Sequence, residues 1–110
     1  MSGSPSSTRD GAIVRDFLIV NQRGLHARAS AKFVTAVAAM DGCEVRVAKD
    51  GHSAAGGSIL GLMMLGAAKG DTVELSVAGA DAEERLAELA ALVESGFGED
   101  SRVARAPRGA

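Results

Sequence analysis

The feature that most constrains the fold is a clean alternation of apolar and polar residues in two short segments, Cys43–Lys49 and Thr72–Ala78. Successive side chains of a β-strand point to opposite faces, so this pattern is typical of a sheet that buries one face and exposes the other. The inward-facing positions are Cys43, Val45, Val47, Val73, Leu75 and Val77.

Two further segments have the character of strands. Ile13–Val20 is apolar and rich in β-branched residues, and it ends at the polar turn Asn21-Gln22-Arg23-Gly24. Asp50-Gly51 is a dipeptide typical of tight hairpin turns. The residues after it, His52–Ala54, are therefore predicted to return alongside the preceding strand.

A first helix is predicted over Ala27–Met40. Its alanines favour helix, and its larger apolar residues share one face. These are Phe33, Val37 and Met40. Asp41-Gly42 ends the helix, because glycine readily adopts the left-handed conformation that follows a last turn.

Two more helices are predicted in the second half of the chain. A short one has Ser58 as its N-cap and stops at Gly66. A longer one has Asp81 as its N-cap, Glu84 in the register of a capping box, and Gly96 as its end. Its apolar stripe consists of Ala82, Leu86, Leu89 and Val93.

In chain order these elements are β-α-β-β-α-β-α. One-sided strands and a hairpin predict an α+β fold, a two-layer open-faced sandwich in which an antiparallel four-stranded sheet is covered on one side by helices. We expect one domain at residues 13–98 between flexible tails at 1–12 and 99–110. The second tail carries Arg102, Arg105 and Arg108, interpreted as a solvated end, with contact to an acidic partner as the alternative.

Composition excludes several classes of function. A net charge of −2 and the absence of Trp and Tyr argue against nucleic-acid binding through bulk charge or base stacking. No segment resembles a membrane span or a secretion signal. The single cysteine rules out an internal disulfide and fits a reducing compartment, so a cytoplasmic location is expected.

The chain offers few side chains for chemistry. His26, Cys43 and His52 fall on three different elements, so neither a metal site nor a cofactor is expected. We interpret Cys43 as a small core residue and His52 as a solvent-facing strand residue. The glycine-rich segment 51–58 lacks the lysine of a phosphate loop. A hydrolase or acyltransferase using His26 or Cys43 would have no base partner.

His26 stands out because it lies between a glycine turn and the first helix. The free amides and partial positive charge of a helix N-terminus favour a neutral, nucleophilic ring and a bound anion. Arg28 supplies a guanidinium that can grip phosphoryl oxygens. These are the parts needed to accept and hold a phosphoryl group. From these residues alone, a histidine that merely caps a helix beside a solvated arginine is the commoner arrangement.

The segment Gly24-Leu25-His26-Ala27-Arg28, together with residues 58–71, Ser58-Ile59-Leu60-Gly61-Leu62-Met63-Met64-Leu65-Gly66-Ala67-Ala68-Lys69-Gly70-Asp71, carries a resemblance. Over Ile13–Gly96 the chain resembles HPr, the histidine-containing phosphocarrier family of the bacterial phosphoenolpyruvate-dependent phosphotransferase system. The resemblance implies a stoichiometric carrier and not an enzyme. His26 would be phosphorylated on Nδ1 by phosphorylated enzyme I and would pass the group to a histidine of an enzyme IIA-type acceptor.

The resemblance also implies roles for other residues. Arg28 would steady the phosphoryl group, with backbone contacts from Ala27 and Ala29. Ser58 matches a regulatory serine, the target of an HPr kinase/phosphorylase, and a phosphate there is expected to repel enzyme I by its charge. The short helix after Ser58 has more apolar residues than one buried face needs, so part of it is expected to be exposed for partner docking. The docking residues are Ile59, Leu60 and Met63.

Two departures and one alternative accompany the resemblance. Ala29 replaces the usual proline and is expected to leave a looser but working site. Gly56-Gly57 replaces bulkier or basic residues ahead of Ser58. The alternative function is a regulatory binding module of the nitrogen-related phosphotransferase branch, which signals by its phosphorylation state without sugar transport. A monomer is expected, because an oligomer interface would compete with the docking surface.

Overall fold

The structure, a computed structural model, describes residues 7–9 and 11–98. Its sheet is antiparallel throughout and has the strand order β1-β2-β5-β3-β4. The strands are β1 Ser7–Arg9, β2 Ala12–Leu18, β3 Cys43–Lys49, β4 His52–Ala55 and β5 Thr72–Gly79. The helices are α1 Ala27–Ala38, α2 Ile59–Met64 and α3 Ala82–Glu94, followed by the 3₁₀ turn η1 Gly96–Gly98.

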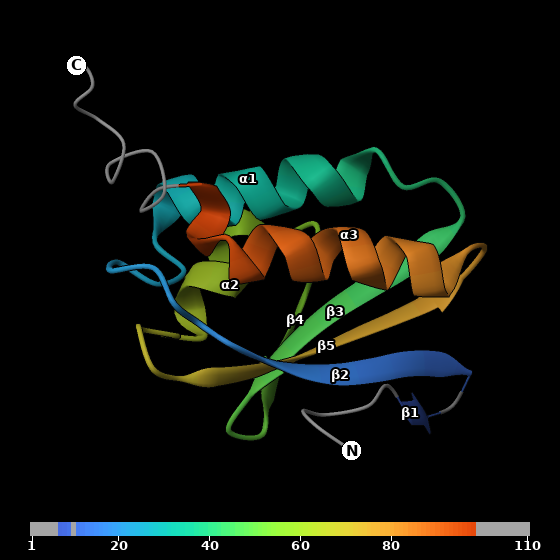
Figure 1. Ribbon diagram of the computed structural model, residues 1–110, viewed down its shortest axis with the longest axis horizontal. Coiled ribbons are helices and arrows are strands. Elements are labelled where there is room, and N and C mark those ends of the chain that lie inside the picture. The colour runs from blue at the N-terminus through green and yellow to red at the C-terminus, as the bar shows by residue number, and fades with distance from the viewer. Residues whose placement is uncertain (1–6, 10, 99–110) are drawn as a thin grey trace.

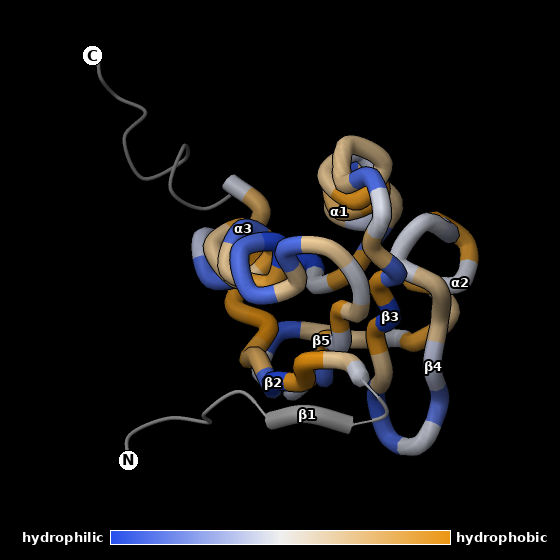
Figure 2. Tube along the Cα trace, turned by 90° about the vertical axis from the view of Figure 1, so that its right-hand side faces the viewer, coloured by the Kyte–Doolittle hydropathy of each residue, from blue (hydrophilic) through white to orange (hydrophobic). Residues whose placement is uncertain are grey.

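All three helices lie on the same side of the sheet (Figure 1). Viewed along the strands, they form one layer above the sheet, with α1 between α3 and α2 (Figure 2). The predicted α+β open-faced sandwich and the order β-α-β-β-α-β-α are therefore confirmed for strands β2 to β5 and for the three helices.

Strand β1 was not predicted. It pairs with the edge of β2 and lies within the segment expected to be a flexible tail. Edge pairing uses backbone hydrogen bonds and needs no apolar alternation, so hydrophobic patterning does not reveal it. The rest of that tail, residues 1–6 and 10, and the predicted tail at 99–110 with its three arginines lie outside the described residues.

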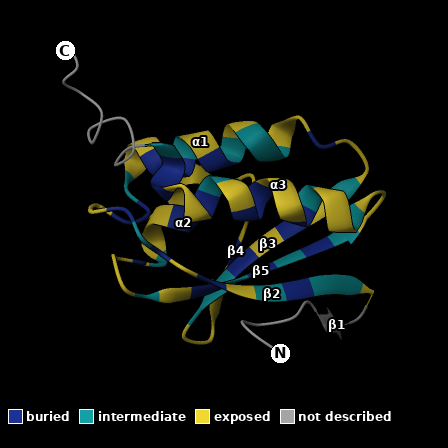
Figure 3. Ribbon diagram, in the orientation of Figure 1, coloured by how far each residue is buried: buried dark blue, intermediate teal, exposed yellow. Residues whose placement is uncertain are grey.

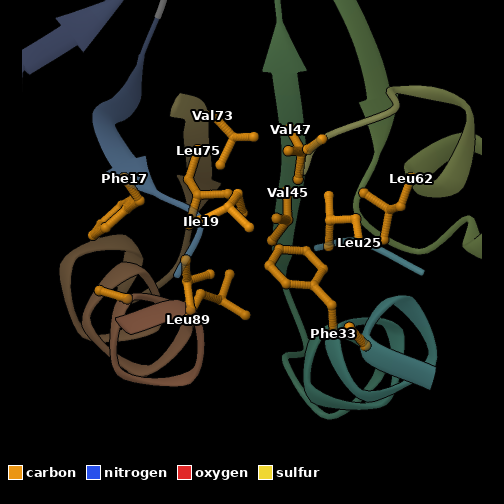
Figure 4. Close-up of a cluster of buried hydrophobic side chains, with 14 of the residues drawn as sticks. Phe17, Ile19, Leu25, Phe33, Val45, Val47, Leu62, Val73, Leu75 and Leu89 are labelled. Atoms are coloured by element: carbon orange, nitrogen blue, oxygen red, sulfur yellow. The ribbon is translucent and has the colours of Figure 1, made fainter. Parts of the chain in front are cut away.

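The core lies between the sheet and the helices. Its centre is β5, whose alternate residues Val73, Leu75 and Val77 are at most 2% exposed, as the alternation predicted. The side chains around them come from every covering element: Phe33 from α1, Leu62 from α2 and Leu89 from α3 (Figure 4). Burying each such side chain stabilises the fold by about 1.5–3 kcal/mol.

One prediction about a single residue was wrong. Asp81 stands before α3, but it has a left-handed backbone (φ 55°) and its side chain makes no capping hydrogen bond with the described backbone. The predicted capping box needs an extended N-cap residue, which this tight turn does not allow. Cys43 packs against the core, as predicted, but it is only partly buried because it begins β3 at the rim of the core, where its Sγ donates to Ala80 O at 2.7 Å.

The turn between β3 and β4 has the backbone conformation that its residue types favour. Asp50 and Gly51 both have positive φ (52° and 84°), as the predicted turn requires. The outer sides of the helices are largely exposed (Figure 3). Within the described residues, every helix is too short or too polar to cross a membrane.

Candidate functional site

His26 is the N-cap residue of α1. Its backbone is extended (φ −80°, ψ −174°), and its Nδ1 accepts a hydrogen bond from the backbone N–H of Arg28 at 3.3 Å. Its carbonyl accepts from Ser30 N at 2.9 Å. The side chain of His26 thus takes the capping position that Ser, Thr, Asp or Asn usually fills.

This capping bond fixes which ring nitrogen faces the helix. A nitrogen that accepts from an N–H carries no proton, so the proton of the neutral His26 ring is on Nε2. The lone pair of Nδ1 then points at the first turn of α1, where amides have no acceptor one turn earlier and the helix dipole is positive. An anionic group attached to Nδ1 would lie at that positive end.

The other residues of this first turn follow His26 directly in the chain. The predicted phosphate-contacting residues Ala27 and Ala29 are its first and third residues; Ala27 is exposed and Ala29 is fully buried. Arg28 lies between them with an exposed side chain. The structure therefore places Arg28 within the same turn as His26, with a guanidinium accessible to an anion from solvent.

The loop before His26 is docked on the segment that follows α2. Gly24 has φ +63°, and a Cβ built on it would lie 2.2 Å from Ala67 O. The next amide, Leu25 N, donates to that same oxygen at 3.0 Å. Only glycine allows the two backbones to approach this closely.

Asp71 holds the segment on which the loop docks. Its Oδ2 accepts from Ala68 N at 2.9 Å, and its carbonyl accepts from Ile19 N at 2.8 Å. Lys49 reaches the same carboxylate at 3.8 Å and Asp50 at 3.0 Å. The hydrogen bond to Asp50 raises the pKa of Lys49, and the nearby Asp71 adds to the rise. A line of contacts therefore runs from the hairpin to the loop before His26.

Ser58 is the N-cap residue of α2, as predicted. Its Oγ accepts from Gly61 N at 3.0 Å, and its backbone is extended. The residue is half-buried, and α2 packs against α1.

Much of the apolar surface of α2 is exposed. Leu62 alone in this helix is fully buried. The exposed fractions are 41% for Ile59, 67% for Leu60, 39% for Met63 and 77% for Met64. The predicted exposure of part of this helix is confirmed, and we call these four side chains the α2 surface.

The remaining candidates lie elsewhere. His52 is exposed on β4, as predicted. A hollow of about 330 Å³ beside the β3–β4 turn is lined by residues such as Asp16, Lys49 and Glu74, none of which belongs to the turn around His26. Within the described part of the chain, we find no group of three or more His, Cys, Asp or Glu residues that could hold a metal ion.

Comparison with known proteins decides the family. The protein-family model described as the PTS HPr component phosphorylation site matches residues 13–95. The chain belongs to the HPr family. It is 49% identical over 81 residues to the phosphocarrier protein HPr of Neisseria meningitidis (serogroup A), a match that covers 74% of this chain and 90% of that protein. It is 40% identical over 83 residues to the phosphocarrier protein NPr of Escherichia coli K12, covering 74% and 91%.

Solved HPr structures share the fold. The crystal structure of HPr-C-His from Thermoanaerobacter tengcongensis matches with a TM-score of 0.74 and 40% identity, over 78% of this chain and 96% of that one. Membership of the HPr family makes this chain a phosphocarrier of the phosphotransferase system.

The sequence patterns do not single out two residues that lie near the site. Asn21 was assigned only to a turn and Ser30 only to a helix, yet both are fully buried with hydrogen bonds to the loop before His26. A polar residue with a tertiary partner has no local pattern, so only a fold-level expectation for the loop could have singled them out.

Proposed function

We propose that the protein accepts a phosphoryl group on Nδ1 of His26 from phosphorylated enzyme I and passes it to a histidine of an enzyme IIA-type acceptor. The observation that carries this proposal is the capping bond from Arg28 N to Nδ1, because it leaves Nδ1 unprotonated at the positive end of α1. An unprotonated nitrogen has the lone pair that attack on phosphorus requires.

In the transfer, the bond between phosphorus and the donor nitrogen of enzyme I breaks as a bond between phosphorus and Nδ1 forms. The electron pair of the broken bond stays on the donor nitrogen, and the proton on Nε2 of His26 is not moved. The new phosphoryl oxygens replace Nδ1 as acceptors for Arg28 N, with Ala27 N and Ala29 N close by. The Arg28 guanidinium pairs with the same oxygens.

The second transfer reverses these steps toward the acceptor, so the protein is consumed and regenerated stoichiometrically and is not an enzyme. It acts without a cofactor, as a monomer in the cytoplasm. Partners dock on Ile59, Leu60 and Met63 of the α2 surface, whose exposed apolar side chains suit several partners in turn.

Ser58 is the regulatory site of this proposal, modified by an HPr kinase/phosphorylase. A phosphate there adds about −1.5 to −2 charge at the start of the helix that carries the α2 surface. The charge weakens the docking of enzyme I and leaves the fold intact, since phosphate oxygens can accept from Gly61 N as Oγ does.

Intact-mass analysis tests the carrier chemistry. The full chain is incubated with enzyme I, phosphoenolpyruvate and Mg²⁺, and we expect one acid-labile phosphoryl group on the wild type and none on His26→Ala. The matched control is His52→Ala, which removes the other histidine of the chain and should still take up one group. Addition to His26→Ala, or none to a folded wild type beside active enzyme I, would refute the proposal.

A second candidate is supported by the 40% identity to the protein named NPr. In it, the phosphorylation state of His26 signals within the nitrogen-related branch, and no sugar is transported. Phosphorylated protein offered an equimolar mixture of a sugar-type and a nitrogen-related IIA domain distinguishes the two. Faster loss of the group to the nitrogen-related domain would favour this candidate.

A further inference from the structure

Two polar side chains are fully buried in the described part of the chain, Asn21 and Ser30. They flank His26 in sequence, and each donates a hydrogen bond to the backbone just before it. Asn21 Nδ2 donates to Gly24 O at 2.9 Å, and Ser30 Oγ donates to Leu25 O at 3.3 Å. Two buried polar groups thus converge on two consecutive peptide groups.

Ser30 contacts both peptide groups of His26. Its Oγ holds the carbonyl of Leu25, which shares a rigid, planar peptide group with the nitrogen of His26. Its backbone N–H donates to the carbonyl of His26 itself at 2.9 Å. The planes on either side of the His26 Cα are therefore both tied to one residue, and those planes set the direction in which the ring projects.

Asn21 fixes the loop one residue earlier. Besides the bond from its side chain to Gly24 O, its carbonyl accepts from Gly24 N at 3.2 Å, so both polar groups of the Gly24 backbone are held by Asn21. Gly24 is also the residue in close contact with Ala67, so this bond keeps the loop in the left-handed conformation that the contact needs. The carbonyls of Gly24 and Leu25 belong to buried residues, and a buried carbonyl without a donor is costly.

We propose that Ser30 and Asn21 are positioning residues for phosphoryl acceptance, which hold the His26 ring so that Nδ1 faces the amide of Arg28 before the transfer and the incoming phosphorus during it. The inference rests on the proposed function of His26. Displacement of a reacting group by about 1 Å can slow a reaction about 100-fold, so a small rotation of the ring is enough for a large effect.

Ser30→Ala is the first test, because it removes one oxygen and leaves the packing almost unchanged. Thr35→Val is the matched control: Thr35 Oγ1 also donates to a backbone carbonyl of α1, that of Ala31, at 2.9 Å, but it is exposed and lies more than a turn further on. With phosphorylated enzyme I as donor, we expect Ser30→Ala to lower kcat about tenfold without raising KM. Thr35→Val should change neither constant.

Nitrogen NMR of the His26 ring gives a readout that does not depend on transfer. The wild type should show the proton on Nε2, and Ser30→Ala should shift part of the population to the Nδ1-protonated form and speed hydrogen exchange at Arg28 N. Asn21→Ala, where it folds, should act in the same direction. The proposal is overturned if Ser30→Ala leaves both the ring signals and kcat at wild-type values.

These measurements distinguish the positioning role of Ser30 and Asn21 from the carrier function of His26. If Ser30→Ala alters the ring signals but the wild type takes up no phosphoryl group, the carrier chemistry of His26 is refuted and the effect of Ser30 on the ring still stands. If the wild type is phosphorylated and Ser30→Ala has the same kcat and the same ring signals, only the positioning role is refuted.

Discussion

The N-termini of α1 and α2 are built from the same local parts. Each has a residue with an extended backbone as its N-cap, and in each the side chain of that residue accepts from an amide of the first turn. His26 Nδ1 accepts from Arg28 N at 3.3 Å, and Ser58 Oγ accepts from Gly61 N at 3.0 Å. Both are also proposed to carry a phosphate.

The two sites differ in what surrounds the cap. The turn before His26 is held from inside by Asn21, Ser30 and the contact between Gly24 and Ala67. Ser58 begins a helix of only six residues, most of whose apolar side chains face solvent. An atom that must meet phosphorus in line needs a fixed position. A serine whose phosphate acts through its charge needs only to be near the surface where partners dock.

The largest effect should come from Gly24→Ala. The new Cβ would overlap Ala67 O at 2.2 Å, in addition to the strain of a side chain at φ +63°, so we expect a loss of about 3–5 kcal/mol in the free energy of unfolding. Gly66→Ala at the end of α2 has a similar φ of +68° and open space around it, and should lose only about 1–2 kcal/mol. Denaturant unfolding measures both. Equal losses would show that the docked loop before His26 imposes nothing beyond its backbone angle.

Arg28→Ala should have the next largest effect, on chemistry and not on stability. We expect phosphoryl acceptance at His26 to slow about 100-fold, because one charged donor to the phosphoryl oxygens is lost. Arg28→Lys should recover part of the rate, since an ammonium keeps the charge without the bidentate geometry. Arg46→Ala is the control; its side chain bonds Ser53 on β4. Quenched-flow measurement of the phosphoryl-transfer rate tests this prediction. A rate in Arg28→Ala within twofold of that in Arg46→Ala would exclude a role of Arg28 in stabilising the phosphoryl group.

How far the sequence predicts the molecule depends on how local each signal is. The strands β3 and β5 follow from alternation, and the cap at Ser58 follows from its residue type, because those patterns act within a few residues. Asp81 has the same favourable residue type but makes no cap, since the turn after β5 forces it into a left-handed conformation. Local rules hold where tertiary structure does not contradict them.

The candidate site divides in the same way. His26 and Arg28 could be identified from their place at a helix start and from the resemblance, because both signals depend on short runs of consecutive residues. Asn21 and Ser30 could not, because their partners are set by how the loop folds back on α1 and on the segment after α2. The sequence therefore singled out the proposed reacting group and missed the buried residues that hydrogen-bond to the loop before it.

Ser58→Asp tests the second N-cap. Asp caps helices as well as Ser does, so the free energy of unfolding should change by less than about 0.5 kcal/mol. The added charge beside the α2 surface should raise KM for phosphorylated enzyme I about tenfold and leave kcat unchanged. Ser53→Asp places the same charge on exposed β4 and should leave KM at the wild-type value. If the two variants have the same KM, charge at Ser58 does not govern docking.

The smallest effect should come from Leu60→Ala. This side chain is 67% exposed, so its removal should cost almost no stability, whereas loss of an apolar contact in the docked complex should raise KM for enzyme I about fivefold. Leu18→Ala is the matched control, because Leu18 is also a largely exposed leucine, at 54%, but it ends β2 and does not belong to the α2 surface. Leu18→Ala should leave KM unchanged. If both substitutions raise KM equally, exposed apolar area anywhere on the molecule serves docking, and the contrast between a rigid site at α1 and an adaptable surface at α2 fails.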